Sequence, residues 1–254
     1  MINLAERHQY ILNKLHKDGN INVVDLYKEL KVSSVTIRKD LKLLEQKKLL
    51  FRTHGGATLS NPYIADRPVN EKEKIQSNEK VRIGEVAAEL VQDHDSIIIG
   101  SGTTVLAFAR SIQPKEGLMV ITSALNVALE LMKFPNVEVL QLGGLLRKSS
   151  SSVMGTYAEN ILSDFFCSKL FLGVDGIDLD FGLTTTNAME AHLNRQMISV
   201  SQKIIVLADS TKFGRRGFGK ICGLDEVDHV ITDSGVSDNI VKILESHGIT
   251  VTIV

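Results

Sequence analysis

Apolar residues recur at helical spacing in the first 30 residues, and the residues between them mark where each helix stops. Ile11 and Leu15 lie one turn apart, and this stripe predicts a helix over residues 4–17. Gly19 follows, at a position where glycine often ends a helix because it tolerates a left-handed backbone. The next apolar repeat predicts a second helix over residues 24–30. The first segment is therefore expected to be a helical pair.

A third helix is expected after a tight turn, and its faces differ in chemistry. Ser33 sits at the N-cap position, where its hydroxyl can accept a free backbone N–H of the first turn. Ile37, Leu41 and Leu44 form the apolar stripe that this helix would bury. The polar side chains on its other faces are Ser34, Thr36, Arg38, Lys39 and Lys42. This arrangement is typical of a helix that enters the major groove of double-stranded DNA.

Two short apolar segments then flank a glycine-rich tip. Residues 49–53 and 57–59 are expected to form the strands of a hairpin, with His54 and Gly55 at its turn. Three helices followed by a hairpin predict a small winged helix-turn-helix domain over residues 1–59. The alternative that the pattern leaves open is a winged helix that binds another protein instead of DNA.

The expected DNA contacts follow from how such a domain docks. A reading helix contacts bases mainly from its N-terminal half and phosphates along its flanks. We therefore expect Ser34, Thr36 and Arg38 to approach base edges. Contacts to the phosphate backbone or the minor groove are expected from Ser33, Lys39, Lys42, Arg52, His54 and Gly55.

Charge is unevenly divided along the chain. Residues 1–57 carry eleven Lys and Arg against six Asp and Glu, whereas the remaining residues carry 18 against 24. A basic segment joined to an acidic one fits a DNA reader attached to a part that does not touch DNA. The excess of positive charge in the first segment is small, so by itself it is weak support for DNA binding.

The pattern changes after residue 59. Residues 60–76 contain two prolines and no sustained periodicity, which predicts a linker. From residue 77 to residue 254, short apolar runs alternate with helical patterns. Strands are expected at 96–100, 118–122, 137–142, 169–174, 204–208, 230–232 and 250–254. This alternation predicts an α/β domain whose mostly parallel sheet has helices on both faces, over residues 77–254.

The loop after the first of these strands has the chemistry of a phosphate cradle. Gly100–Thr104 contributes glycines, hydroxyl donors and the start of a helix, all of which favour an anion. It lacks the Gly-Lys-Ser/Thr ending of a nucleotide-binding loop, so ATP is not expected. The alternative is that the segment is an ordinary turn.

Other loops are expected at the same edge of the sheet, because ligands in such folds bind at the carboxyl ends of strands. Cations there suit a phosphate, and carboxylates suit sugar hydroxyls. The expected effector-binding residues are Ser101, Gly102, Thr103, Thr104, Gly144, Arg147, Asp175, Thr184, Thr185, Glu190 and Lys212. The alternative is that Asp175 caps a turn and Lys212 is solvated.

Several classes of protein do not fit the sequence. No apolar run is long enough to span a bilayer, and the first residues lack the pattern of a signal peptide. Cys167 and Cys222 lie in apolar stretches, which favours buried free thiols over a disulfide or a metal site. We therefore expect a cytoplasmic protein with no metal, no cofactor and no membrane partner.

The chain resembles the DeoR family of bacterial transcriptional regulators. The resemblance rests on the segments ILNKL, VVDLYKELKVSSVTIRKDLKLLE, RTHGGA, ITSALNVALEL, LGGLLR, LGVDGID and VLADSTKFG. One departure is Lys47-Lys48, where the family usually carries a glycine before the wing, so either Lys48 takes a left-handed conformation or the end of the helix differs.

The effector domain of that family resembles ribose-5-phosphate isomerase. In this sequence Gly100–Thr104 matches the isomerase phosphate loop, Asp175–Asp178 its catalytic loop, Lys212 its lysine and Glu190 its general base. The resemblance implies a phosphorylated sugar or a related metabolite as effector, and a repressor of a sugar-utilisation operon. A homo-dimer or homo-tetramer is expected, because one reading helix covers a short half-site of the operator.

Two alternatives differ in class from a regulator. A sugar-phosphate isomerase fused to a DNA-binding module is disfavoured, because this chain has Phe181–Thr185 where the isomerase has a lysine-led glycine run. A structural nucleoid protein would need neither the hydroxyl-rich loops nor a large α/β domain. We therefore expect ligand binding without turnover.

Overall fold

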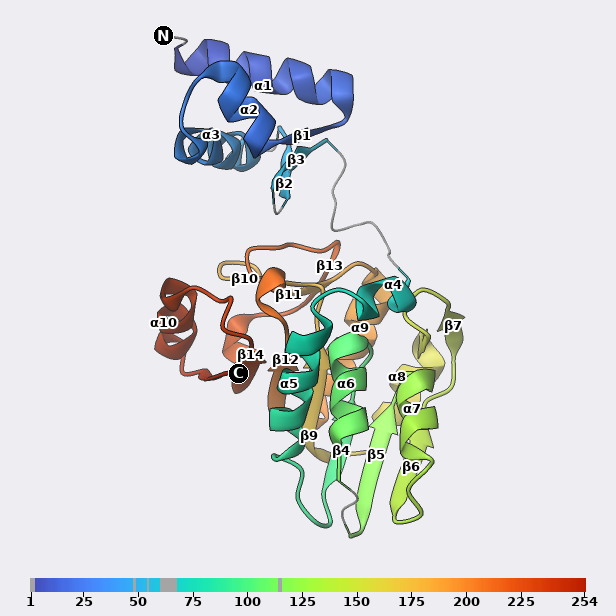
Figure 1. Cartoon of the computed structure of the whole chain (residues 1–254). Helices are drawn as coiled ribbons and strands as arrows, with labels where there is room; N and C mark the ends of the chain where they lie inside the picture. The colour runs from blue at the N-terminus through green and yellow to red at the C-terminus, as the bar shows by residue number, and fades with distance from the viewer. Residues whose placement is uncertain (1–2, 48, 54, 60–67, 114–115) are drawn as a thin grey trace. The chain divides into compact units, whose positions relative to one another are not determined.

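The computed structural model describes residues 3–47, 49–53, 55–59, 68–113 and 116–254 (Figure 1). The chain divides into two compact units, Met1–Ala65 and Asp66–Val254, and each contains its own hydrophobic core. Two features expected from the sequence, at Lys48 and His54, lie outside the described residues. No helix in the described parts of the chain combines the length and apolarity needed to cross a membrane.

Three helices and three short strands form the first unit. In chain order these are α1 (Leu4–Asp18), β1 (Asn20–Asn22), α2 (Val23–Leu30), α3 (Ser34–Gln46), β2 (Phe51–Thr53) and β3 (Gly56–Thr58). Asn3 and Glu6 form a reciprocal capping box at the start of α1, and Gly19 ends it with φ of 74°. The helical pair, the reading helix and the hairpin are thus present as the sequence predicts.

The hairpin is part of a three-stranded antiparallel sheet. Strand β3 lies between β1 and β2, so the wing is joined to the segment that connects the first two helices. Gly56 permits this pairing, because a Cβ atom there would lie 1.7 Å from the carbonyl oxygen of Ile21. The wing is therefore fixed to the helices through backbone pairing.

A buried carboxylate joins α1 to α3. Asp40 is only 2% exposed and lies on the inner face of α3 beside the apolar stripe. Arg7 donates to it from Nε and Nη2 at 2.5 and 2.9 Å, and Nε2 of His8 lies 3.2 Å from Oδ1. A buried charge is tolerated when it is paired in this way, so the network fixes how α3 is held against α1.

A seven-stranded parallel sheet forms the centre of the second unit (Figure 1). Its order is β15 (Thr250–Ile253), β14 (His229–Thr232), β12 (Ser201–Leu207), β9 (Cys167–Gly173), β4 (Ser96–Ile99), β5 (Leu118–Thr122) and β6 (Val137–Gln141). These are the seven strands expected from the sequence. From β4 the chain proceeds outward to β6, returns to β9 and continues in the opposite direction. The point where the order reverses therefore lies between β4 and β9.

Helices cover both faces of this sheet, which confirms the predicted fold class. The bounds are α5 (Ser77–Ala88), α6 (Thr103–Ser111), α7 (Leu125–Leu131), α8 (Thr156–Leu162), α9 (Ala188–Ser199) and α10 (Asp238–Ser246). Ile97 and Ile99 pack in the core under α5, α6 and α7, whereas Ile98 packs in the core under α8, α9 and α10. The alternation of side chains along a strand supplies both cores from one apolar run.

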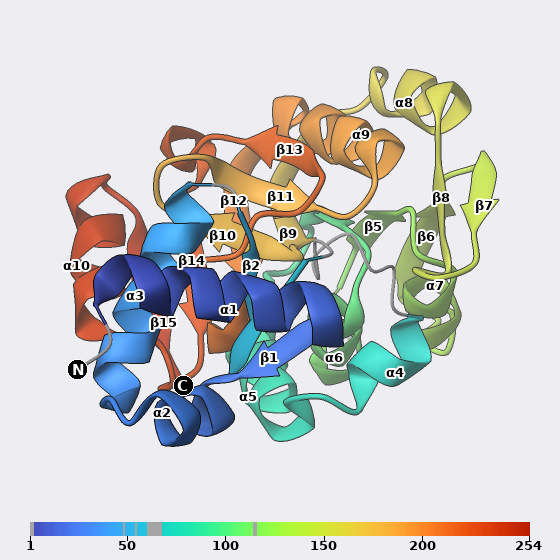
Figure 2. The same cartoon turned by 90° about the horizontal axis from the view of Figure 1, so that it is seen from above.

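Smaller elements lie around the carboxyl edge of the sheet. They are α4 (Val69–Glu73), the hairpin of β7 (Leu145–Arg147) and β8 (Ser152–Met154), and an antiparallel sheet of β10 (Gly176–Asp178), β11 (Gly182–Thr185) and β13 (Gly219–Cys222). None of these elements is among those expected from the sequence. Helix α4 lies inside the stretch expected to be a linker and packs beside α6 (Figure 2). Strand β11 contains Thr184 and Thr185, two of the expected effector-binding residues.

Candidate functional site

The outer face of α3 presents the side chains that the sequence assigns to DNA. Ser33 caps the helix by accepting from the backbone N–H of Thr36 at 3.1 Å, and the two hydroxyl oxygens lie 2.9 Å apart. Arg38, Lys39 and Lys42 are exposed, and none of them forms an ion pair with a described residue. Three free cations along one helix form a positive surface suited to the phosphates and base edges of a duplex.

Val35 was missed in the sequence-based assignment. It is 60% exposed, and it lies between Ser34 and Thr36 in the first turn of α3. An exposed aliphatic side chain in that turn suits contact with a thymine methyl group. Its position off the stripe of Ile37 and Leu41 was the available signal.

The wing residues are more constrained than those of α3. The backbone N–H of Arg52 donates to Glu45 at 2.8 Å, and its guanidinium lies 3.7 Å from the same carboxylate. The carbonyl oxygen of Gly55 accepts from the backbone N–H of Val23 at 2.8 Å. The hairpin tip is therefore attached to the start of α2, and Arg52 is oriented by the end of α3.

The candidate ligand site lies at the carboxyl ends of three adjacent strands, β4, β9 and β12. The loop after β4 leads into α6, and Gly102 at its N-cap has φ of 129° and supplies no capping side chain. The first N–H groups of α6 are thus left for another acceptor, and an anion is the acceptor that a helix N-terminus favours. The cavity is lined by Val69, Lys72, Ser101, Gly102, Thr103, Thr104, Arg147, Ser149, Ser150, Gly173, Val174, Asp175, Thr185, Glu190 and Lys212.

Glu190 is the most enclosed carboxylate of this cavity, at 8% exposure. Ser101 donates its hydroxyl to Glu190 at 2.6 Å, Thr185 lies 3.2 Å from the other oxygen, and Arg147 forms an ion pair with it. Burial raises the pKa of Glu190, and Arg147 offsets this rise only in part. The N-cap Asn187 orients the first turn of α9 and so directs the carboxylate into the cavity.

Asp175 follows β9 and faces two lysines. Lys72 Nζ lies 2.9 Å from its Oδ1, while the Thr185 hydroxyl and the Thr186 backbone N–H donate to its Oδ2 at 3.1 and 3.2 Å. Burial by itself would raise the pKa of Asp175, but Lys72 and Lys212 hold it at about 2. The carboxylate is therefore ionised throughout the physiological range.

Lys212 is a cation without a partner. It lies in the short helical turn after β12, and among the described residues its ammonium group makes no hydrogen bond or ion pair. Burial lowers its pKa, against the attraction of Asp209 and Asp175. A partly buried ammonium with no direct ion pair favours an anionic ligand.

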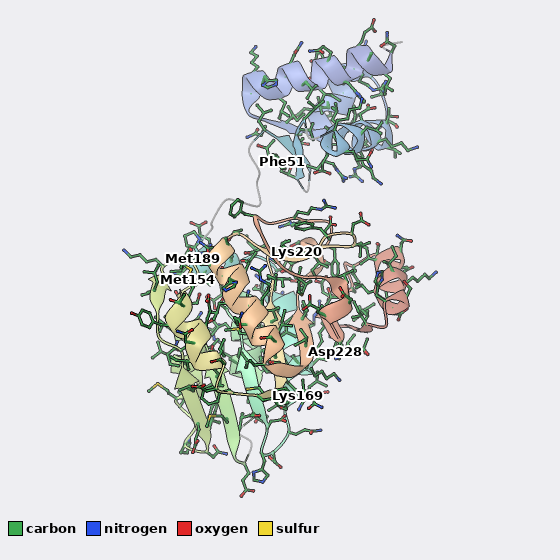
Figure 3. All side chains as sticks on the ribbon, turned by 180° about the vertical axis from the view of Figure 1, so that it is seen from behind. Phe51, Met154, Lys169, Met189, Lys220 and Asp228 are labelled. Carbon is green, nitrogen blue, oxygen red and sulfur yellow. The ribbon has the colours of Figure 1, made fainter. Side chains whose placement is uncertain are left out.

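The structure brings together nine of the expected effector residues and leaves two outside the cavity. Thr184 is fully buried, and its hydroxyl donates to the carbonyl of Gly176 and accepts from the N–H of Gly217. Gly144 lines an open groove instead, with Met154 and Met189, which lie close together in Figure 3. The hydroxyl of Thr184 is therefore used inside the fold, and Gly144 lines a different groove from the other expected effector residues.

Lys72 and Val69 were not expected in the site. Both belong to α4, inside the stretch assigned to a linker, and nothing in the local sequence distinguishes Lys72 from Lys74 or Lys80. The serine run after Arg147 was a usable signal for the lining residues Ser149 and Ser150.

Comparison with known families agrees with this division of the molecule. The model of the DeoR-like helix-turn-helix domain matches residues 7–62, and the model of the DeoR C terminal sensor domain matches residues 75–234. A winged helix-turn-helix joined to a sensor domain defines a DNA-binding transcriptional regulator. The chain belongs to the DeoR family of such regulators.

Curated relatives match along almost the whole chain. The putative aga operon transcriptional repressor of Escherichia coli O157:H7 is 36% identical over 252 residues, which are 98% of this chain and 94% of that protein. The glycerol-3-phosphate regulon repressor of Escherichia coli K12 is 30% identical, over 96% of this chain and 97% of that protein. Among solved structures, ribose 5 phosphate isomerase A of Neisseria gonorrhoeae aligns with a TM-score of 0.40 at 18% identity, over 54% of this chain and 53% of that one.

Proposed function

We propose that this protein represses a sugar or sugar-derivative utilisation operon and that a phosphorylated sugar metabolite controls its binding to DNA. In this proposal residues 1–59 bind the operator and residues 77–254, together with α4, bind the effector. Relatives that are named as repressors of the aga operon and of the glycerol-3-phosphate regulon support this assignment.

The observation that carries the effector assignment is the unpaired cation Lys212 beside an uncapped helix N-terminus. Lys212 and the start of α6 both face the cavity at the point where the strand order reverses. The ammonium group forms no direct ion pair with a described residue, and the helix has no side-chain capping acceptor. A phosphate supplies both, with its charge and with its oxygens.

The carboxylates of the same cavity suit the rest of such a ligand. Asp175 and Glu190 both lie within hydrogen-bond distance of the Thr185 hydroxyl, and carboxylate oxygens accept hydrogen bonds from sugar hydroxyls. Arg147 pairs with Glu190 and lines the same cavity, where a guanidinium suits a phosphate. The site thus combines a phosphate end and a hydroxyl end.

Binding without turnover fits the surroundings of the carboxylates. Isomerisation of a sugar phosphate needs donors that stabilise an enediolate. The segment Gly182–Thr185, which replaces the glycine run of the isomerase, is a central strand whose backbone pairs with β10 and β13. Its N–H groups are therefore engaged in the sheet, and we propose that the protein has no isomerase activity.

On the DNA side we propose that a homo-oligomer places two copies of α3 on a symmetric operator. Ser34, Thr36 and Arg38 would contact bases, while Ser33, Lys39, Lys42 and the wing would contact the backbone. One helix of 13 residues covers a short half-site, so two copies are needed for a specific site.

The test is fluorescence anisotropy on DNA from the region upstream of the protein's own gene, at fixed salt, titrated with a panel of sugar phosphates. Release of the DNA by one phosphorylated compound, and not by its unphosphorylated sugar, is the expected result. Tight DNA binding that no compound changes would contradict the effector assignment, and turnover of ribose 5-phosphate would support the isomerase instead.

A further inference from the structure

The ligand cavity is filled by its own ion pairs. Its volume is about 40 Å³, whereas small-molecule sites usually have at least roughly 300 Å³. Inside it, Lys72 forms an ion pair with Asp175, and Arg147 forms an ion pair with Glu190. A sugar phosphate therefore enters only if at least one of these pairs opens.

The two partners of the Lys72–Asp175 pair are held very differently. Asp175 directly follows the central strand β9 and accepts hydrogen bonds from Thr185 and Thr186 besides Lys72. These contacts, and the nearby charge of Lys212, remain if Lys72 leaves. Asp175 thus keeps hydrogen-bond donors whether Lys72 is paired with it or displaced.

Lys72 lies on a helix of only five residues, α4, which has no side-chain cap. Besides the Lys72–Asp175 pair, the polar contacts of this segment with the rest of the unit include a hydrogen bond from the Val69 N–H to the Ser149 carbonyl at 2.7 Å and the Arg110–Glu73 ion pair at 2.6 Å. Lys80 donates to the carbonyls of Lys72 and Ile75, and the side chain of Val69 is buried. Short helices derive little stability from their own hydrogen bonds. Of the two partners, Lys72 is the one that can be displaced.

We infer that Lys72 is an effector-binding residue, which exchanges Asp175 for the phosphate of the ligand and carries α4 with it. This inference rests on the proposed function, because it takes a phosphate as the ligand. A phosphate carries up to two negative charges and three acceptor oxygens, so it attracts an ammonium group more strongly than one carboxylate oxygen does.

The position of α4 gives the exchange a consequence for DNA binding. The described part of the second unit begins at Pro68, the N-cap of α4, and the first unit ends at Ala65. Lys72 is therefore the cavity cation nearest in the chain to the DNA-binding unit. A ligand that prefers one position of α4 shifts the population of that position, and this is the requirement for control of operator binding.

The first test is a titration of the full-length protein with inorganic phosphate, followed by calorimetry at fixed ionic strength. Lys72→Gln should weaken phosphate binding roughly tenfold, the effect of losing one charge-assisted hydrogen bond. Lys74→Gln is the matched control, since it removes the same charge from an exposed residue two positions away, and its affinity should equal that of the wild type. Unchanged or tighter binding by Lys72→Gln would overturn the inference.

A second experiment distinguishes direct contact between Lys72 and the phosphate from a role of Lys72 in neutralising Asp175. In an Asp175→Asn background, where no carboxylate needs a partner, Lys72→Gln should again weaken phosphate binding roughly tenfold. No further loss there would mean that Lys72 serves only Asp175, and the inference would fail while the proposed function stands. If the wild-type protein binds neither inorganic phosphate nor any phosphate ester, the proposed function and the inference fail together.

Discussion

The outer face of α3 and the ligand cavity both collect positive charge, but they hold it in opposite ways. Arg38, Lys39 and Lys42 are exposed and form no ion pair with a described residue. In the cavity, Lys72 and Arg147 are paired with buried or half-buried carboxylates, and only the third lining cation, Lys212, forms no direct ion pair with a described residue. One surface is ready for its partner, and the other must rearrange first.

The difference follows from the partners. DNA is a large polyanion, so exposed cations gain affinity from every phosphate they approach, with no internal contact to break. A small anion offers few contacts, and its binding changes the protein only if it displaces internal ones. The exposed cations of α3 therefore favour high affinity for DNA. The paired cations of the cavity favour a change in the protein when a ligand binds. The following predictions test this contrast.

The largest effect is expected from Arg38→Ala. Loss of a base contact costs about 1–3 kcal/mol, which is a roughly fivefold to 150-fold loss of operator affinity for each half-site. Effector binding should be unchanged, because the two regions belong to separate units. Arg82→Ala, at an exposed arginine of α5, is the control for loss of charge. Anisotropy with operator DNA and calorimetry with phosphate measure the two affinities, and loss of both by Arg38→Ala would refute the two-module account.

Lys212→Ala should have the reverse pattern, with a change in ligand binding and none in DNA binding. Removal of the unpaired ammonium is expected to weaken phosphate or effector binding by about 1.5–3 kcal/mol, or roughly tenfold to a hundredfold, and to leave ligand-free operator binding in place. Lys203→Ala, an exposed lysine of β12, is the matched control. If calorimetry gives the same affinity for Lys212→Ala as for Lys203→Ala, the site assignment is wrong.

Acid should destabilise the paired cavity in a way that depends on Asp175. Its pKa is about 2 in the folded protein against an ordinary value of 3.8, so its contribution to stability is present above pH 4 and is lost as the pH falls toward 2. The shift corresponds to roughly 2 kcal/mol, of which about 1 kcal/mol is lost by pH 3. Denaturant unfolding at pH 6 and pH 3 should therefore show a smaller loss of stability in Asp175→Asn than in the wild type. Equal losses would show that the fold does not lower the pKa of Asp175.

The smallest effect is expected from Lys42→Ala on the outer face of α3. Loss of one phosphate contact should weaken binding to specific and unrelated DNA alike, by a few fold, and reduce the slope of log affinity against log salt by about 1. Lys242→Ala, an exposed lysine of α10 in the second unit, should leave the slope unchanged. A loss restricted to the specific operator would instead assign Lys42 to base contact.

Periodicity and local chemistry in the sequence were enough to determine the elements. The stripe of Ile37, Leu41 and Leu44 is buried as expected, and Ser33 and Gly19 act as the predicted caps. The apolar runs became the seven parallel strands, because a strand buried on both faces is apolar throughout. Gly100–Thr104 is recognisable because its glycines, hydroxyls and helix start are adjacent in the chain.

Tertiary structure decided which side chains meet. Thr184 and Thr185 are neighbours in the sequence, but consecutive residues of a strand point to opposite faces, so Thr185 reaches the cavity and Thr184 does not. Lys72 meets Asp175 across 103 positions of the chain, and Arg7 meets Asp40 across 33. Such contacts depend on sheet order and helix packing, which a local pattern does not encode. For this reason the sequence determined the two modules and the phosphate loop, and only the fold disclosed that α4 contributes a cation to the ligand site.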